Sequence, residues 1–216
     1  VIREQKIPFR PNWETVVTPV VDFALKRREV DRNNVAILGI SFGGYLVPRA
    51  TAFEHRLKAC IANGGVYDLH GVVMKRAEME PALDDPQASA EIDKAIYKMM
   101  ETTPALRWAF DNGMFTFNAG SPTDWMRKTR PYTMKDVAGG IKCDMLVVDS
   151  EDDKDMPGQA RQLYSALKGP KEFMLFTREE GAGEHCQIGA AILSNQRMLD
   201  WLDGKMKTAV KGKKRP

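Results

Sequence analysis

A short apolar run that leads into a glycine-rich segment constrains this chain most. Residues 35–40 are apolar and contain β-branched side chains, so they predict a buried strand. The run enters Gly39-Ile40-Ser41-Phe42-Gly43, and a helical pattern follows to about residue 53. Such a sharp strand-to-helix turn needs Gly39 and Gly43, which would let the two backbones pass closely. Ser41 would then stand at the strand's carboxyl end, where its hydroxyl can attack a carbonyl.

The composition predicts one globular domain with a substantial core. The chain has 216 residues, of which 43% are hydrophobic and 28% are charged. The net charge of +3 is concentrated in residues 205–216, which we expect to be a flexible basic tail. No basic patch interleaved with aromatic residues accompanies the tail, so we expect no nucleic-acid partner.

Cysteine content and hydropathy indicate a cytoplasmic protein without a membrane anchor. The three cysteines are an odd number without close pairs, which predicts reduced thiols rather than disulfides. Their spacing does not match a zinc site, and we expect no metal. We also expect no signal peptide and no membrane contact, because the sequence contains no apolar run of spanning length.

Three further apolar runs predict a mostly parallel α/β sheet. Strands are expected at 57–62, 145–148 and 171–176, with helices at 13–28, 157–167 and about 187–202, and Gly204 beyond the last helix. Residues 1–11 read as an extended leading segment. We expect the core to comprise residues 1–65 and 131–204.

Residues 66–130 differ from the rest and predict a helical insertion that acts as a cap. The segment is too long for a simple connection between two strands. It is rich in methionine and aromatic residues, which at helical spacing are usually core residues. A cap that closes over an apolar substrate would need the same adaptable surface.

Chemically reactive groups follow three of the predicted strands. Ser41 follows the first, an acidic cluster at 149–153 follows the third, and His185 follows the fourth. Functional groups gather at the carboxyl ends of parallel strands, and a serine nucleophile needs a histidine base held by a carboxylate. Of the other two histidines, His55 should be exposed, and His70 is either structural or part of a pocket.

The order serine, acid, histidine resembles that of the α/β-hydrolases, and the resemblance covers most of the chain. The segment 147–153, Val-Val-Asp-Ser-Glu-Asp-Asp, is similar to the family's strand-then-acid segment. This alignment places the catalytic acid at Asp153, with Asp152 as the alternative and Asp155 as a weaker one. Asp149 and Glu151 would be turn or surface groups.

Five segments narrow the resemblance to one subgroup. They are Phe-Arg-Pro-Asn-Trp at 9–13, Gly-Ile-Ser-Phe-Gly-Gly-Tyr-Leu at 39–46, Ala-Phe-Glu-His-Arg at 52–56, Asn-Gly-Gly-Val-Tyr-Asp at 63–68 and Glu-Gly-Ala-Gly-Glu-His-Cys at 180–186. The subgroup contains the fungal yellowish-green-type polyketide-shortening hydrolases of pigment biosynthesis. The bacterial pseudooxynicotine hydrolase and the fermentation-respiration-switch-type esterases are related to it.

The resemblance implies a serine triad that cleaves a carbon–carbon or ester bond beside a carbonyl without a cofactor. The substrate would be a polyketide-like or aromatic ketone, and a general carboxylesterase is the alternative. The backbone N–H of Phe42 would bind the oxyanion. We take Tyr67, His70, Trp108 and Phe115 as the substrate contacts.

The predicted strands correspond to the family's strands five to eight, so strands one to four are absent from the sequence. The elbow strand would then be an exposed sheet edge, and the loop that supplies the second oxyanion donor would be missing. Three hypotheses remain. In the first, the protein is an active serine hydrolase whose missing half is supplied by another chain, as a homodimer or a complementing N-terminal chain, or is lost from the sequence. In the second, it is a truncated gene product with the triad but little activity. In the third, it is a non-catalytic protein that uses the pocket and the exposed edge for binding or dimerisation.

Overall fold

The computed structural model describes residues 2–74 and 79–206, which group into two compact units. The sheet unit comprises the described parts of Asn12–Asp68 and Met134–Pro216, and the helical unit those of Val1–Pro11 and Leu69–Thr133. Most of the predicted tail at 205–216 lies outside the described residues. The leading segment contributes to the helical unit because the Phe9 N–H donates to the Thr116 oxygen at 2.8 Å.

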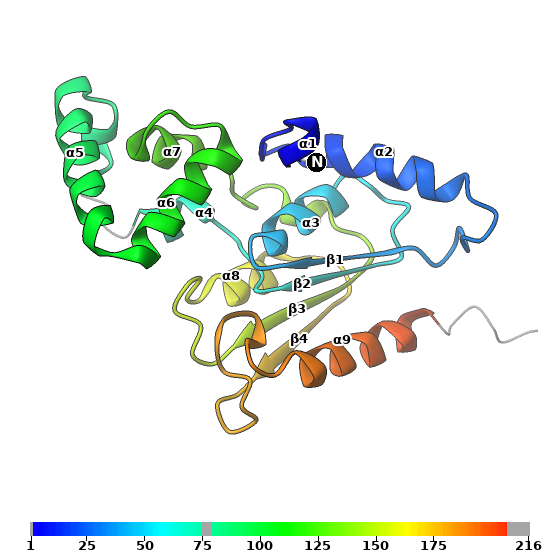
Figure 1. Ribbon diagram of the computed structural model, residues 1–216. Helices are drawn as coiled ribbons and strands as arrows, with labels where there is room; N and C mark the ends of the chain where they lie inside the picture. The colour runs from blue at the N-terminus through cyan, green and yellow to red at the C-terminus, as the bar shows by residue number, and fades with distance from the viewer. Residues whose placement is uncertain (1, 75–78, 207–216) are drawn as a thin grey trace, which may run out of the picture. The chain divides into compact units, whose positions relative to one another are not determined.

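The elements alternate between strands and helices in the sheet unit (Figure 1). In chain order, the sheet unit contains α2 (Glu14–Leu25), β1 (Ala36–Ile40), α3 (Gly43–Thr51), β2 (Ala59–Asn63), η3 (Ala138–Gly140), β3 (Asp144–Ser150), α8 (Gln159–Ala166), β4 (Lys171–Phe176), η4 (His185–Gln187) and α9 (Ala191–Met206). The helical unit contains α1 (Ile2–Gln5), α4 (Leu69–Val73), η2 (Pro81–Leu83), α5 (Pro86–Thr102), α6 (Pro104–Phe117) and α7 (Pro122–Thr129).

The four strands form one sheet in the order β1-β2-β3-β4. All neighbouring pairs are parallel, which confirms the mostly parallel sheet expected from the sequence. The helices α2 and α3 lie on one side of this sheet and α9 on the other (Figure 1). β2 and β3 are almost entirely buried. Because strands covered on both faces need apolar side chains on both, they read as nearly continuous apolar runs in the sequence.

Apolar side chains pack on both faces of the sheet among the described residues. On the α9 side, Ile61 and Leu146 pack with Met198 of α9. On the other side, Val17 and Val21 of α2 pack with the α3 helix. β1 is one of the two edge strands, and its Leu38 and Ile40 are 39% and 53% exposed. The exposed apolar edge that the sequence predicts is therefore present.

The helices α5, α6 and α7 of the helical unit have sequence signals at their first turns. Pro86, Pro104 and Pro122 each open a helix, where the missing N–H costs no hydrogen bond. The Ser121 side chain caps α7 by accepting the Asp124 N–H. Inside the unit, Leu83, Ile96, Met100, Phe110 and Met126 form a buried cluster, so these methionine and aromatic residues are core residues.

Two of the predicted elements differ from those observed. Residues 2–5 form a helical turn within the segment expected to be extended. The last helix begins at Ala191 rather than near 187 and runs past Gly204 to Met206. Lys205 pairs with Asp144 at 3.2 Å, and this long-range contact holds the additional turn. Within the described residues, no helix combines the length and hydropathy needed to cross a membrane.

Candidate active site

The turn between β1 and α3 holds Ser41 in a strained backbone conformation. Ser41 has φ of +57°, a left-handed value that costs about 1–2 kcal/mol for a residue with a Cβ. Its N–H donates to the Asn63 oxygen at 2.9 Å, and its own carbonyl accepts the Gly44 N–H at 2.7 Å. These two bonds keep the serine on the elbow at the carboxyl end of β1.

The glycines that the elbow requires differ in part from those predicted. A Cβ on Gly39 would lie 2.1 Å from the Gly43 oxygen, and one on Gly44 would lie 2.3 Å from the Gly64 oxygen. A Cβ on Gly43, in contrast, would meet nothing within 4 Å. The close approach therefore depends on Gly39 and Gly44, and the expected steric need for Gly43 is wrong.

A hydrogen-bonded chain joins the serine, the histidine and the acid inside the sheet unit. The Ser41 Oγ lies 2.8 Å from His185 Nε2, and His185 Nδ1 lies 2.7 Å from Asp153 Oδ2. The Asp153 side chain is 4% exposed and that of His185 is 13% exposed. The structure thus brings together the three residues that the sequence analysis assigned as nucleophile, base and acid.

The local electrostatics favour an ionised acid and a strongly basic histidine. Burial alone would raise the pKa of Asp153, but bonds from His185 and from the Met156 and Asp155 N–H groups outweigh it, so the pKa is lowered. The hydrogen bond to Asp153 raises the pKa of His185, and the neighbouring Cys186 raises it further. The pair can therefore accept the Ser41 proton and stabilise the resulting imidazolium.

The alternative acids have other roles. Asp152 binds the Arg178 guanidinium, with 2.8 Å between its Oδ2 and the arginine Nε, and not the histidine. The backbone N–H of Asp155 donates to the Asp153 carboxylate. Asp149 was expected at a turn or on the surface, but it belongs to β3 and is 8% exposed. Burial raises its pKa.

The residues assigned as substrate contacts lie in both units, and that role stays a prediction. The Tyr67 N–H donates to the Gln159 side chain at 3.0 Å. The two ring nitrogens of His70 lie 2.7 Å from Thr129 Oγ1 and from Glu80 Oε2.

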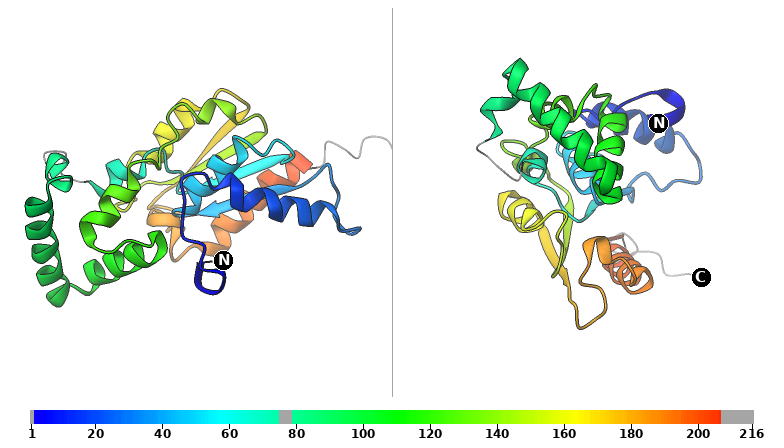
Figure 2. Two further views of the ribbon diagram at one scale, coloured as in Figure 1. Left: turned by 90° about the horizontal axis from the view of Figure 1, so that it is seen from above. Right: turned by 60° about the vertical axis from the view of Figure 1, so that its left-hand side comes forward.

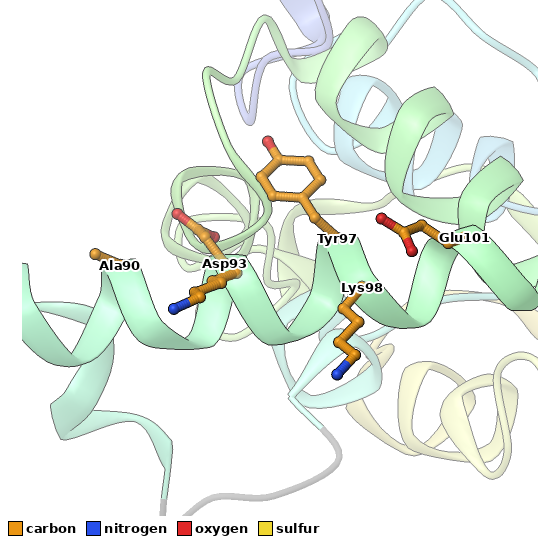
Figure 3. Close-up of a pocket in the computed structure, with 6 residues that line it drawn as sticks. Ala90, Asp93, Tyr97, Lys98 and Glu101 are labelled. Carbon is orange, nitrogen blue, oxygen red and sulfur yellow. The ribbon is translucent and has the colours of Figure 1, made fainter.

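The two aromatic candidates lie on α6 and expose much of their surface. Trp108 is 70% exposed and Phe115 is 56% exposed. Figure 3 shows a separate hollow along α5, lined by Ala90, Asp93, Lys94, Tyr97, Lys98 and Glu101. None of the assigned site residues lines that hollow.

Sequence reasoning missed Asn63 as a residue that contacts the nucleophile. Its backbone oxygen accepts the Ser41 N–H, and the Cys186 Sγ lies 3.7 Å from the same oxygen. A buried asparagine that ends an otherwise apolar strand is a signal that could have singled it out. Cys186 was also missed as a neighbour of the base, because its Sγ lies 3.3 Å from His185 Nε2.

Solved structures share this arrangement of elements. The 2,6-dihydroxy-pseudo-oxynicotine hydrolase superposes with a TM-score of 0.68 at 21% identity, covering 98% of this chain and 50% of its own. The α/β hydrolase GrgF from Penicillium sp. sh18 superposes with a TM-score of 0.62 at 21% identity, covering 90% of this chain and 71% of its own. This chain has the α/β-hydrolase fold.

Sequence comparisons agree with the α/β-hydrolase fold. Residues 17–101 match the model of the prolyl oligopeptidase family. Hydrolase LUC6 of Fusarium sp is 28% identical over 218 residues, covering 94% of this chain and 51% of the relative. The 20-hydroxy-prefusarin hydrolase FUS2 of Gibberella moniliformis is 28% identical over 221 residues, with the same two shares. The chain therefore resembles fungal hydrolases and spans about half the length of these curated relatives.

Proposed function

We propose that the protein is a serine-triad hydrolase that cleaves a carbon–carbon bond beside a carbonyl in a polyketide-like or aromatic ketone. The observation that carries the proposal is the hydrogen-bonded chain from Ser41 through His185 to Asp153, with Ser41 on a strained elbow. Pre-oriented nucleophile, base and acid are what acyl transfer requires. The same first step would open an ester.

In the first half of the reaction, the Ser41 oxygen attacks the carbonyl carbon while His185 Nε2 takes the hydroxyl proton. The tetrahedral oxyanion accepts a hydrogen bond from the Phe42 N–H at the start of α3, where the helix dipole also favours negative charge. Collapse of the intermediate breaks the bond to the neighbouring carbon. The leaving carbanion, stabilised as an enolate or phenolic carbon, takes the proton back from His185.

In the second half, water removes the acyl group from the serine. His185 takes a proton from the water, whose oxygen attacks the acyl carbon, and then returns that proton to the departing Ser41 oxygen. The products are a carboxylic acid and the shortened carbon fragment, and the enzyme is regenerated. Asp153 remains ionised throughout and holds the imidazole in the required tautomer.

Two observations support a ketone substrate of this kind. Similar proteins are named as hydrolases of 20-hydroxy-prefusarin and of 2,6-dihydroxy-pseudo-oxynicotine. The helical unit also exposes large apolar side chains, including Trp108 and Phe115, which suit an aromatic ligand.

The test is a paired turnover assay with product identification by mass spectrometry. The protein is incubated with a naphthopyrone and, separately, with p-nitrophenyl acyl esters. We expect the naphthopyrone to be shortened and Ser41→Ala to be inactive on both substrates. Consumption of the esters alone would replace the carbon–carbon assignment by a carboxylesterase, and turnover that survives Ser41→Ala would refute the serine mechanism.

A further inference from the structure

Three buried polar side chains form a continuous hydrogen-bonded chain at the carboxyl ends of β2 and β3. Asn63 Nδ2 donates to Gln187 Oε1 at 2.9 Å, and Gln187 Nε2 donates to Ser150 Oγ at 2.9 Å. Asn63, Ser150 and Gln187 are 2%, 5% and 1% exposed. We call this set the amide clasp. It joins the last residue of β2 and the last residue of β3 to the loop before α9.

Each member of the amide clasp is either hydrogen-bonded to one triad residue or lies two positions from it in the sequence. The Asn63 backbone oxygen accepts the Ser41 N–H at 2.9 Å. The Ser150 backbone oxygen accepts the Asp153 N–H at 3.2 Å. Gln187 lies two residues after His185 in the same short turn, η4. The clasp therefore connects the three segments that carry nucleophile, acid and base.

The turn that carries the base is held in an unfavourable backbone conformation. Cys186 and Gln187 have φ of +52° and +54°, although neither is a glycine. Two successive left-handed residues persist only where the surroundings fix them. The Gln187 side chain supplies such fixation because its amide is bonded at both ends inside the core.

We propose that the amide clasp is the positioning device of the triad, in which Gln187 fixes the His185 ring between Ser41 and Asp153. Its catalytic consequence rests on the proposed function. An apolar side chain at position 187 would fill the same space without fixing a direction, whereas two hydrogen bonds set both distance and orientation. Gln187 is thus a positioning residue that touches no reacting atom.

The test compares Gln187→Leu with Gln159→Leu as a matched control. Gln159 is also a buried glutamine, 7% exposed, whose side chain accepts two hydrogen bonds, from the Tyr67 and Asp68 N–H groups at 3.0 and 2.7 Å. Both variants lose two hydrogen bonds in the sheet unit, but only Gln187→Leu removes the amide clasp. The readouts are the rate of Ser41 labelling by a fluorophosphonate as a function of pH and the proton resonance of the His185 Nδ1–H.

We expect Gln187→Leu to lower the maximal rate of Ser41 labelling, reached at high pH, on the order of a hundredfold. This is the loss expected when the base is displaced by about 1 Å. The titration midpoint should also move to lower pH, because a weaker bond to Asp153 leaves the histidine less basic. The Nδ1–H resonance should weaken or disappear. Gln159→Leu should keep both the midpoint and the resonance.

Two results would overturn the proposal. One is a Gln187→Leu protein with the original midpoint and resonance, and the other is an equal change in both variants. If Gln187→Leu does not fold, Ser150→Ala removes one end of the clasp with a smaller loss of volume, and the same two criteria apply. A wild-type protein that is not labelled would refute the proposed function, while the resonance would still test the clasp.

Discussion

The contrast between Gly39 and Gly43 gives a sharp test of the elbow. A Cβ on Gly39 would lie 2.1 Å from the Gly43 oxygen and 2.5 Å from its carbonyl carbon. Ordinary carbon–oxygen contacts begin near 3.3 Å, so Gly39→Ala must push β1 and α3 apart by about 1 Å. Both contacts are backbone atoms that no change of rotamer can move. Gly43→Ala is the matched control, because its Cβ meets nothing within 4 Å.

We expect Gly39→Ala to lower the free energy of unfolding by roughly 2–4 kcal/mol, at or above the usual cost of overpacking. Gly43→Ala lies in the first turn of α3 and should raise it by about 0.5–1 kcal/mol, because alanine is the better helix former. Urea unfolding followed by circular dichroism measures both variants. If the two variants proved equally stable, the steric account of the elbow would be refuted.

Three further outcomes follow from the geometry of the triad and of α3. Asp153→Asn should lower the rate of fluorophosphonate labelling by about 10⁴, whereas Asp152→Asn should leave it unchanged, and equal effects would contradict the choice of acid. The labelling rate should rise with pH as His185 loses its proton, with a midpoint above 6.5 because the bond to Asp153 raises its pKa, and a midpoint below 6.5 would contradict this. Arg49→Met should cost about 1–3 kcal/mol of stability, because the carboxylate of Glu14, 18% exposed, loses two bonds of 3.0 Å. An unchanged urea midpoint would show that the pair contributes nothing.

The strands and the fold class could be predicted because their signals are local. A strand buried on both faces must be apolar over most of its length, and β2 before Asn63 and the 145–148 stretch of β3 are. The order of Ser41, Asp153 and His185 along the chain then indicated the architecture. Choosing Asp153 over Asp152 needed an alignment to known hydrolases, because the two residues are adjacent and chemically identical.

Features that depend on distant contacts could not be read from the sequence. Asn63 and Gln187 are 124 positions apart, and neither residue type marks a partner. Gly204 is a plausible helix end in isolation, but Lys205 binds Glu172 and keeps the helix intact. The spacing of the elbow glycines likewise does not tell which Cβ would meet a carbonyl.

The central claim is that Ser41 is an activated nucleophile, and intact-protein mass spectrometry after fluorophosphonate treatment tests it most directly. The account predicts a single adduct on Ser41 that is absent from Ser41→Ala and strongly reduced in His185→Ala. A folded protein that forms no adduct, or an adduct that persists in Ser41→Ala, would contradict it.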